Sequence, residues 1–314
     1  MKTHTVGSEY LDMRLDRYVL KAHRELSKIA VQKMIRTGKI KLNGKKADAG
    51  THLKEGDRIS VFSVSENRTM LPQKKNLPPV EIVYEDEYFL AVNKPAGLLT
   101  HPDGKKEDSL TYRIIAHLYE DLKQYHGMFV PGVVTRLDVN TSGIVLAPKT
   151  PSAAKAMNEL MQKNKFVKKY LVLVKGDFPK RIKAVHYALK DSERNKMELY
   201  DTPQPKSEEM ITVFDPLYSE GSYTLLSAQL LTGKTHQIRA QLGALGFPVA
   251  GDIKYGDSHI NRELKQSLGL SRQFLHCYSV SFPMWTDFST VTVLCAPPPD
   301  LDNVLRALRI PFEL

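Results

Sequence analysis

A polar stretch that contains several prolines divides this chain into two parts. Residues 63–78 include Ser63, Ser65, Pro72 and Pro78 and show almost no apolar periodicity, which is typical of a linker. A linker adds nothing to a hydrophobic core, so each side of it has to build a core of its own. The chain of 314 residues is long enough for this, and we predict a small module over residues 1–62 and a large domain over residues 79–314.

The small module has the pattern of two helices and a small sheet. An apolar stripe at helical spacing runs through residues 14–24 and consists of Leu15, Tyr18, Val19 and Ala22. Ser27 is a suitable N-cap for a second helix, which ends at Gly38. Residues 40–45 suit a strand that enters an Asn-Gly turn, and residues 57–62 suit the strand that closes the sheet. We therefore expect an α/β module.

Positive charge is concentrated in this module. The chain has a net charge of +10, and residues 1–62 contain 14 lysines and arginines against 7 aspartates and glutamates. Such a run is usually a solvated face, but it also attracts nucleic acid. The segments 14–17, 26–35 and 40–45 resemble the alpha-L RNA-binding domain of the ribosomal-protein-S-four type. This resemblance implies that the module binds structured RNA through the phosphate contacts Lys28, Lys33, Arg36 and Lys39.

The large domain contains apolar runs that suit buried strands. They cover residues 88–92, 143–147, 170–174, 223–227 and 291–295. Thr150 and Pro151 can open a helix that follows the second run. We predict an α+β fold in which a mixed, largely antiparallel sheet is flanked by helices and loops.

Composition excludes several classes of protein. No uncharged apolar run of about 18 residues occurs and the N-terminus lacks an apolar stretch, so we expect a cytoplasmic protein that is not bound to a membrane. Two cysteines are too few for a disulfide framework or a four-thiolate zinc site, and the ten histidines show no ligand spacing. We expect no metal site, and we expect a monomer.

Two segments carry charged residues that could perform chemistry. Asp138 lies between an apolar run and a Thr-Ser-Gly turn, on a loop before the predicted strand 143–147. An aspartate in such company is more often a turn residue that bonds its own backbone. Residues 231–242 place Lys234, His236 and Arg239 near the N-terminal half of a predicted helix, where anions bind. A solvated basic helix face fits this second pattern equally well.

Two further segments are weaker signals. Tyr170 begins a strand after two lysines, and a single tyrosine there is more often part of a core. Lys94 ends a strand in a loop with proline and glycine, which by itself indicates only a turn.

Taken together and in order, the four segments resemble the RluA family of RNA pseudouridine synthases. The match runs from about residue 79 to residue 285 and includes Arg-Leu-Asp-x-x-Thr-Ser-Gly at 136–143 and Thr-Gly-Lys-x-His-Gln-Ile-Arg at 232–239. The resemblance implies that Asp138 is the catalytic aspartate, that Arg136 inserts near a flipped uridine, and that Tyr170 stacks on its base. It also implies that Arg239 pairs with Asp138 and that Lys94 and Lys234 lie along the RNA backbone.

The implied reaction breaks the bond between ribose C1′ and uracil N1 and joins C1′ to C5, so it needs no cofactor. A carboxylate could attack C1′ or remove the C2′ proton, and the sequence does not separate the two roles. A cation beside a buried carboxylate favours its charged form, which is the part expected of Arg239. Three positions depart from the usual family pattern, namely Thr135, Lys234 and Gln241.

Ribosomal RNA of the large subunit is the first choice of substrate, and transfer RNA is the alternative. Two rival functions stay open, one of them a catalytically silent RNA-binding protein of ribosome assembly. The other is a hydrolase that uses Asp138, although no second acidic motif of similar strength is present to donate a proton.

Overall fold

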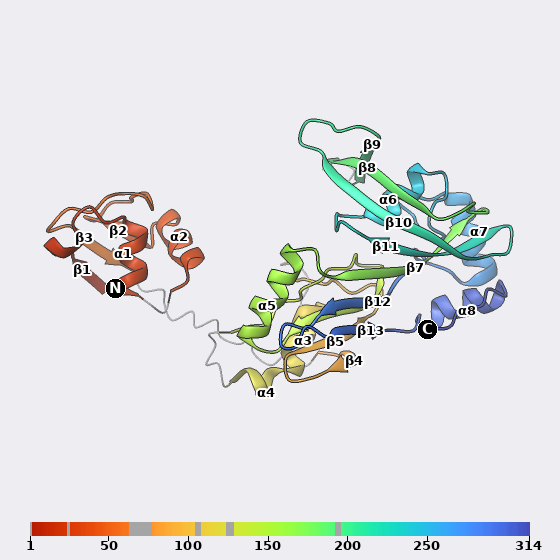
Figure 1. Ribbon diagram of the computed structural model, residues 1–314, viewed down its shortest axis with the longest axis horizontal. Coiled ribbons are helices and arrows are strands. Elements are labelled where there is room, and N and C mark those ends of the chain that lie inside the picture. The colour runs from red at the N-terminus through yellow and green to blue at the C-terminus, as the bar shows by residue number, and fades with distance from the viewer. Residues whose placement is uncertain (1, 24–25, 63–76, 104–107, 124–128, 192–195) are drawn as a thin grey trace. The chain divides into compact units, whose positions relative to one another are not determined.

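The computed structural model describes residues 2–23, 26–62, 77–103, 108–123, 129–191 and 196–314 (Figure 1). The described residues up to 62 belong to one compact unit, and those from 77 onwards belong to a second. Residues 63–76, which make up most of the predicted linker, lie outside the described residues.

The N-terminal unit packs two helices on a three-stranded antiparallel sheet of order β1-β3-β2. Its elements are β1 (Lys2–Thr5), the short 3-10 helix η1 (Ser8–Tyr10), α1 (Leu15–Ala22), α2 (Lys28–Arg36), β2 (Ile40–Leu42) and β3 (Arg58–Val61). The Ser27 hydroxyl accepts a hydrogen bond from the Ala30 N–H and caps α2 as predicted. Leu15 and Val19 are buried in the core of this unit, whereas Ala22 at the end of α1 is exposed. Strand β1 was not among the expected elements.

The second unit is built on one large, mostly antiparallel sheet, as predicted. The strand order is β4-β5-β6-β12-β7-β11-β10-β8-β9, and β13 pairs with β12. Only the contact between β12 and β6 is parallel among the described pairs. The strands are β4 (Glu81–Glu85), β5 (Phe89–Lys94), β6 (Ser142–Pro148), β7 (Val167–Lys175), β8 (Ile182–Asp191), β9 (Lys196–Tyr200), β10 (Glu208–Ser219), β11 (Tyr223–Leu230), β12 (Leu275–Pro283) and β13 (Thr290–Leu294).

Helices cover both faces of this sheet. They are α3 (Leu110–His117), α4 (Tyr119–Leu122), α5 (Pro151–Gln162), α6 (Gln237–Ala244), α7 (Ser258–Leu268) and α8 (Pro299–Ala307). Helix α5 packs near β6 and begins at the Thr150 cap as expected, whereas α6 packs near β9 (Figure 1). Alternate residues of β7 enter two hydrophobic clusters, with Tyr170 and Val172 in one and Leu171 and Leu173 in the other.

Both cysteines, Cys277 and Cys295, are buried free thiols. Within the described ranges, no helix is long and apolar enough to cross a membrane.

Candidate active site

Asp138 lies on the loop that precedes β6, and neighbouring segments hold this loop through its backbone. The Thr100 hydroxyl donates to the Leu137 carbonyl at 2.7 Å. The Val139 carbonyl accepts from the Gly97 N–H and from the Lys94 ammonium, both at 2.9 Å. The residues on either side of Asp138 are therefore fixed, while its own side chain remains 28% exposed.

Lys94 is buried, which contradicts the prediction that it lies along the RNA backbone. Its side chain is 0% exposed, and its Nζ donates to the carbonyl oxygens of Pro95, Leu98 and Val139 at 2.8 to 2.9 Å. Three carbonyl partners use all three N–H groups of the ammonium. Lys94 therefore joins the end of β5 to the loop that carries Asp138.

Arg239 contacts Asp138 and a second aspartate with different sides of its guanidinium. Its Nη1 donates to Asp138 Oδ2 at 2.8 Å, while its Nε and Nη2 donate to the two oxygens of Asp252 at 2.6 and 2.9 Å. The Asp252 side chain is 0% exposed and also accepts the N–H groups of Lys254 and Tyr255. Arg239 is thus aimed at Asp138 by a buried two-pronged ion pair.

The charges in this cluster support one another. Burial acts to lower the pKa of Arg239, but hydrogen bonds and charge from Asp252, followed by Asp138, outweigh it and raise that pKa. Burial likewise acts to raise the pKa of Asp252, but Arg239 outweighs it and the pKa of Asp252 is lowered. Both members of the pair are therefore charged, and Arg239 offers Asp138 a permanent positive neighbour.

His236 and Tyr255 close one side of the cluster. The His236 Nδ1 lies 3.1 Å from the Tyr255 hydroxyl, and its Nε2 lies 3.9 Å from Asp138 Oδ2. Burial is the main cause that lowers the pKa of His236, so the imidazole is neutral at neutral pH. Its backbone has a positive φ of 54° at the N-cap of α6, which turns the chain from the preceding loop into the helix.

Buried glutamines anchor the helix that carries Arg239. Gln241 is 0% exposed; its amide donates to the carbonyls of Ala184 and Met210, and its oxygen accepts from the Thr212 hydroxyl. Gln237 donates to the Thr212 hydroxyl and to the Ile211 carbonyl. The departure at Gln241 therefore serves the attachment of α6 to β8 and β10, away from any solvent-facing site.

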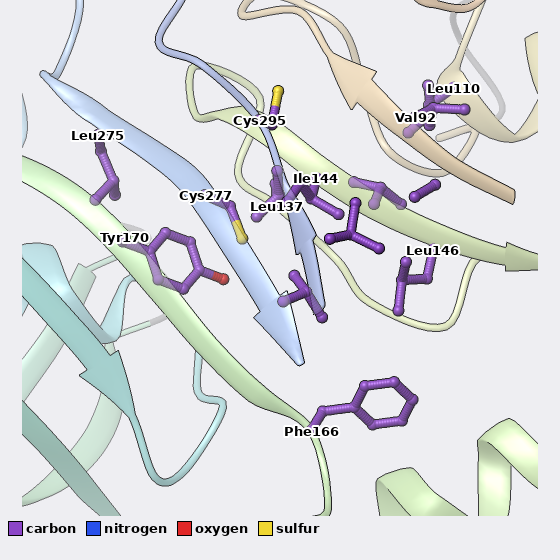
Figure 2. Packing of buried hydrophobic residues seen from close by; sticks show 14 of the residues in the cluster. Val92, Leu110, Leu137, Ile144, Leu146, Phe166, Tyr170, Leu275, Cys277 and Cys295 are labelled. Atoms are coloured by element: carbon purple, nitrogen blue, oxygen red, sulfur yellow. The ribbon is translucent and has the colours of Figure 1, made fainter. Parts of the chain in front are cut away.

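A cavity of about 580 Å³ lies beside Asp138 and is lined by Tyr170. Tyr170 is 5% exposed. Its hydroxyl points toward the Cys277 thiol on β12 (Figure 2). Burial, followed by the charges of Cys277 and Asp138, raises the pKa of Tyr170 well above its usual value. The phenol is therefore protonated at neutral pH, and Tyr170 forms part of the cavity wall.

The remaining predicted residues occupy two places. Arg136 is exposed and Lys234 is half-buried, and both line the cavity. Lys234 also forms an ion pair with Glu208, with Nζ and Oε1 2.8 Å apart. The four cations predicted to contact phosphates are exposed on α2 and after it, in the N-terminal unit, and are Lys28, Lys33, Arg36 and Lys39.

The sequence reasoning missed two residues of the site. Asp252 lies in the segment Gly-Asp-Ile-Lys-Tyr-Gly at 251–256, and nothing in this local pattern indicates that its side chain is buried against Arg239. Lys168 precedes Tyr170 by two residues and therefore shares its side of β7, and this spacing was the signal that could have found it. No group of described histidines, cysteines and carboxylates is arranged to hold a metal ion.

Comparisons with known proteins identify both units. The family model described as RNA pseudouridylate synthase matches residues 88–244, and that of the S4 domain matches residues 13–59. The chain is 31% identical to the ribosomal large subunit pseudouridine synthase C of Buchnera aphidicola subsp. Baizongia pistaciae, over 86% of this chain and 85% of that protein. It is 30% identical to the enzyme of the same name in Pasteurella multocida, over 98% and 94% of the two chains.

A solved structure shares the fold. Human RNA pseudouridylate synthase domain containing 4 superposes with a TM-score of 0.57 at 22% identity, over 73% of this chain and 93% of that chain. The family model covers half of the chain and the relatives extend over most of it. The chain therefore belongs to the RluA family of RNA pseudouridine synthases, which are isomerases, and it carries an N-terminal S4 domain.

Proposed function

We propose that Asp138 is the catalytic carboxylate of this synthase and that it acts on a uridine held in the adjoining cavity. The contact between Arg239 Nη1 and Asp138 Oδ2 at 2.8 Å is the observation that carries this proposal. It leaves Asp138 partly accessible and beside a cation that is itself locked by Asp252. A charged carboxylate in a walled cavity can attack a sugar carbon or remove a proton.

The chemistry needs no other reactant. The C1′–N1 bond breaks, the uracil turns, and C5 bonds to C1′, after which the proton on C5 is lost and N1 gains one. Asp138 either forms a bond to C1′ that the returning C5 displaces, or takes the C2′ proton and later returns it. Arg239 stabilises the negative charge on Asp138 at the start and the end of both routes.

The target uridine has to leave its stack to reach Asp138, which costs a few kcal/mol. Stacking on an aromatic ring returns about 1 to 3 kcal/mol per base. Tyr170 in the cavity wall is the aromatic residue proposed for this, and exposed Arg136 is proposed to fill the space that the base leaves. Lys234 stands at the same cavity and is the proposed contact to the RNA backbone on that side.

We propose large-subunit ribosomal RNA as the substrate. Two relatives that span most of the chain carry the name of ribosomal large subunit pseudouridine synthase C. The S4 unit, with Lys28, Lys33, Arg36 and Lys39 exposed, supplies a basic surface for structured RNA.

The test compares two RNAs from cells that lack the protein. Ribosomal RNA and transfer RNA are incubated separately with the purified protein, and pseudouridine is mapped by carbodiimide modification and primer extension. New stops in large-subunit RNA alone are expected. Stops in transfer RNA alone would contradict the substrate assignment, and no stop in either RNA would contradict catalysis.

A further inference from the structure

Lys168 is a half-buried cation in the wall of the active-site cavity. It lies on β7 between Phe166 and Tyr170, and all three side chains line the cavity. A Cβ added to Gly233 would lie 3.5 Å from its Nζ, so the ammonium faces the loop before α6. Lys168 thus spans from the strand that carries Tyr170 to the loop that leads to Arg239.

The other buried or half-buried cations of the cavity have carboxylate partners. Arg239 is paired with Asp138 and Asp252, and Lys234 is paired with Glu208. Among the described residues, no carboxylate lies within ion-pair distance of Lys168. A negative charge on the Cys277 thiol would raise the pKa of Lys168. Burial, however, raises the pKa of that thiol to about 12. At neutral pH the thiol is therefore uncharged and gives Lys168 no counter-ion.

An unpaired cation in a partly desolvated wall opposes folding. Burial lowers the pKa of Lys168, which means that the folded chain holds this charge less favourably than the unfolded chain does. An anion delivered by a ligand would remove this penalty. Lys168 therefore has the properties expected of a cation whose anionic partner is supplied by the substrate.

We propose that Lys168 binds a backbone phosphate of the RNA strand that enters the cavity, which rests on the proposed function. Residues 168 and 170 are next neighbours on one side of a strand, about 7 Å apart. A nucleotide whose base lies on Tyr170 therefore has a phosphate within reach of a long lysine side chain. Lys168, and not Lys94 as predicted from the sequence, would then contact the RNA backbone at this point.

Lys169 provides a matched control. It is the adjacent residue of the same strand, it is exposed, and it is not among the residues that line the cavity. Replacement of either lysine by methionine keeps an unbranched side chain that is one atom shorter, and it removes the same charge.

The experiment measures binding of an unmodified transcript of the large-subunit RNA over a range of salt concentrations, together with thermal unfolding. We expect Lys168→Met to weaken binding by about tenfold or more and to lower the slope of log affinity against log salt by about 0.7 to 0.9. Its Tm should equal or exceed that of the wild type. Lys168→Arg should keep the wild-type slope, as should Lys169→Met.

Three results would overturn the inference. The first is an unchanged salt slope in Lys168→Met, and the second is an equal loss of slope in Lys169→Met. The third is a fall in the Tm of Lys168→Met, which would mean that the charge of Lys168 stabilises the folded protein. Pseudouridine formation by the wild type is measured on the same transcript. If the wild type is active while Lys168→Met binds normally, the phosphate site is wrong and the proposed function stands.

Discussion

Asp252 illustrates how a residue remote from the solvent can set the state of the site. It holds two of the three guanidinium nitrogens of Arg239 and leaves only Nη1 for Asp138. An asparagine would keep the shape but present an NH2 group to one of these donors. Arg239 would then be free to turn away from Asp138.

We expect Asp252→Asn to slow single-turnover pseudouridine formation by about tenfold to a hundredfold, the range that follows from loss of a charge-assisted hydrogen bond. Loss of a buried charge partner should also cost about 3 kcal/mol of stability. RNA affinity should stay at the wild-type level. Asp257→Asn is the control, because Asp257 is an exposed N-cap of α7 and asparagine caps equally well. Equal rates in the two variants would contradict the positioning role.

The protonation of Lys94 gives the site a pH dependence. Burial, followed by the charge of Arg272, lowers the pKa of Lys94 to about 7, while Asp138 acts in the opposite direction. Above this pH the amine has too few N–H groups for its three carbonyl partners, and the loop that carries Asp138 loosens. We therefore expect the single-turnover rate to fall from about pH 7 to about pH 9.

The contribution of Lys94 to stability changes with pH in a direction that distinguishes the expected fall in rate from unfolding of the protein. The unfolded chain keeps the Lys94 proton up to about pH 10. Between the two pKa values the unfolded state binds more protons, so the contribution of Lys94 to stability rises with pH. A rate that stays flat across this range, with Tm measured alongside, would contradict the account.

The sequence predicts some of these residues and misses others for physical reasons. Arg239 and Asp138 are 101 residues apart, so no local periodicity joins them, and only the ordered motifs suggested the pair. Lysine is usually exposed, and no residue near Lys94 in the sequence indicates that its ammonium donates to three backbone carbonyls. Asp252 was not predicted, because its partner Arg239 is supplied by α6, which begins 15 residues earlier in the chain.

At the scale of elements, the C-terminal helix is connected to the loop of Asp138 through one arginine. Arg272 donates to both oxygens of Asp300 on α8 at 2.7 and 3.1 Å. It also donates to the Asn140 carbonyl and to the Ser142 hydroxyl, both at 3.2 Å. Residues beyond the matched family model thus help to hold the loop.

We expect Asp300→Asn to lower the single-turnover rate by about threefold to tenfold, as for loss of one ordinary hydrogen bond, with RNA affinity unchanged. Asp302→Asn is the matched control, because Asp302 lies on the same helix and pairs only with exposed Arg306 among the described contacts. The same rate in both variants would mean that α8 does not act on the loop.

The predicted strands were the continuous apolar runs, and this explains which ones were found. Strands β5, β6, β7, β11 and β13 lie where they were expected, within a few residues. Along part of β8 and β10, buried residues alternate with exposed or half-buried ones, so a search for continuous apolar runs overlooks these strands. Strand β12 contains buried His276, which forms hydrogen bonds with the Ser142 hydroxyl and the Cys295 carbonyl. Because histidine is polar, it interrupts the apolar run, and the strand was not predicted.

At the scale of the whole molecule, the N-terminal unit is expected to contribute RNA affinity without taking part in catalysis. Four of the cations proposed to contact phosphates are exposed in the N-terminal unit, whereas Asp138 lies in the second. They are Lys28, Lys33, Arg36 and Lys39. Their replacement should therefore weaken binding and leave the chemistry intact.

We expect the fourfold glutamine variant of Lys28, Lys33, Arg36 and Lys39 to lower the slope of log affinity against log salt by about 3 to 4. Its single-turnover rate at saturating protein should equal that of the wild type. A control variant replaces four exposed cations of the second unit, namely Lys155, Lys180, Arg181 and Lys183. An equal loss of slope in the control would show that net charge, and not the S4 unit, governs affinity.

The negatively charged carboxylate of Asp138 is the group proposed to act on the uridine. Asp138→Asn keeps the size of the side chain and its place beside Arg239 but removes the charge. The test is a single-turnover assay in large-subunit RNA from cells that lack the protein, with RNA affinity measured in parallel. Pseudouridine has the mass of uridine, so it is converted to its carbodiimide adduct before mass spectrometry. We expect this variant to bind the RNA with wild-type affinity and to form no product. Pseudouridine formed by the variant would show that the reaction does not need the charge of Asp138.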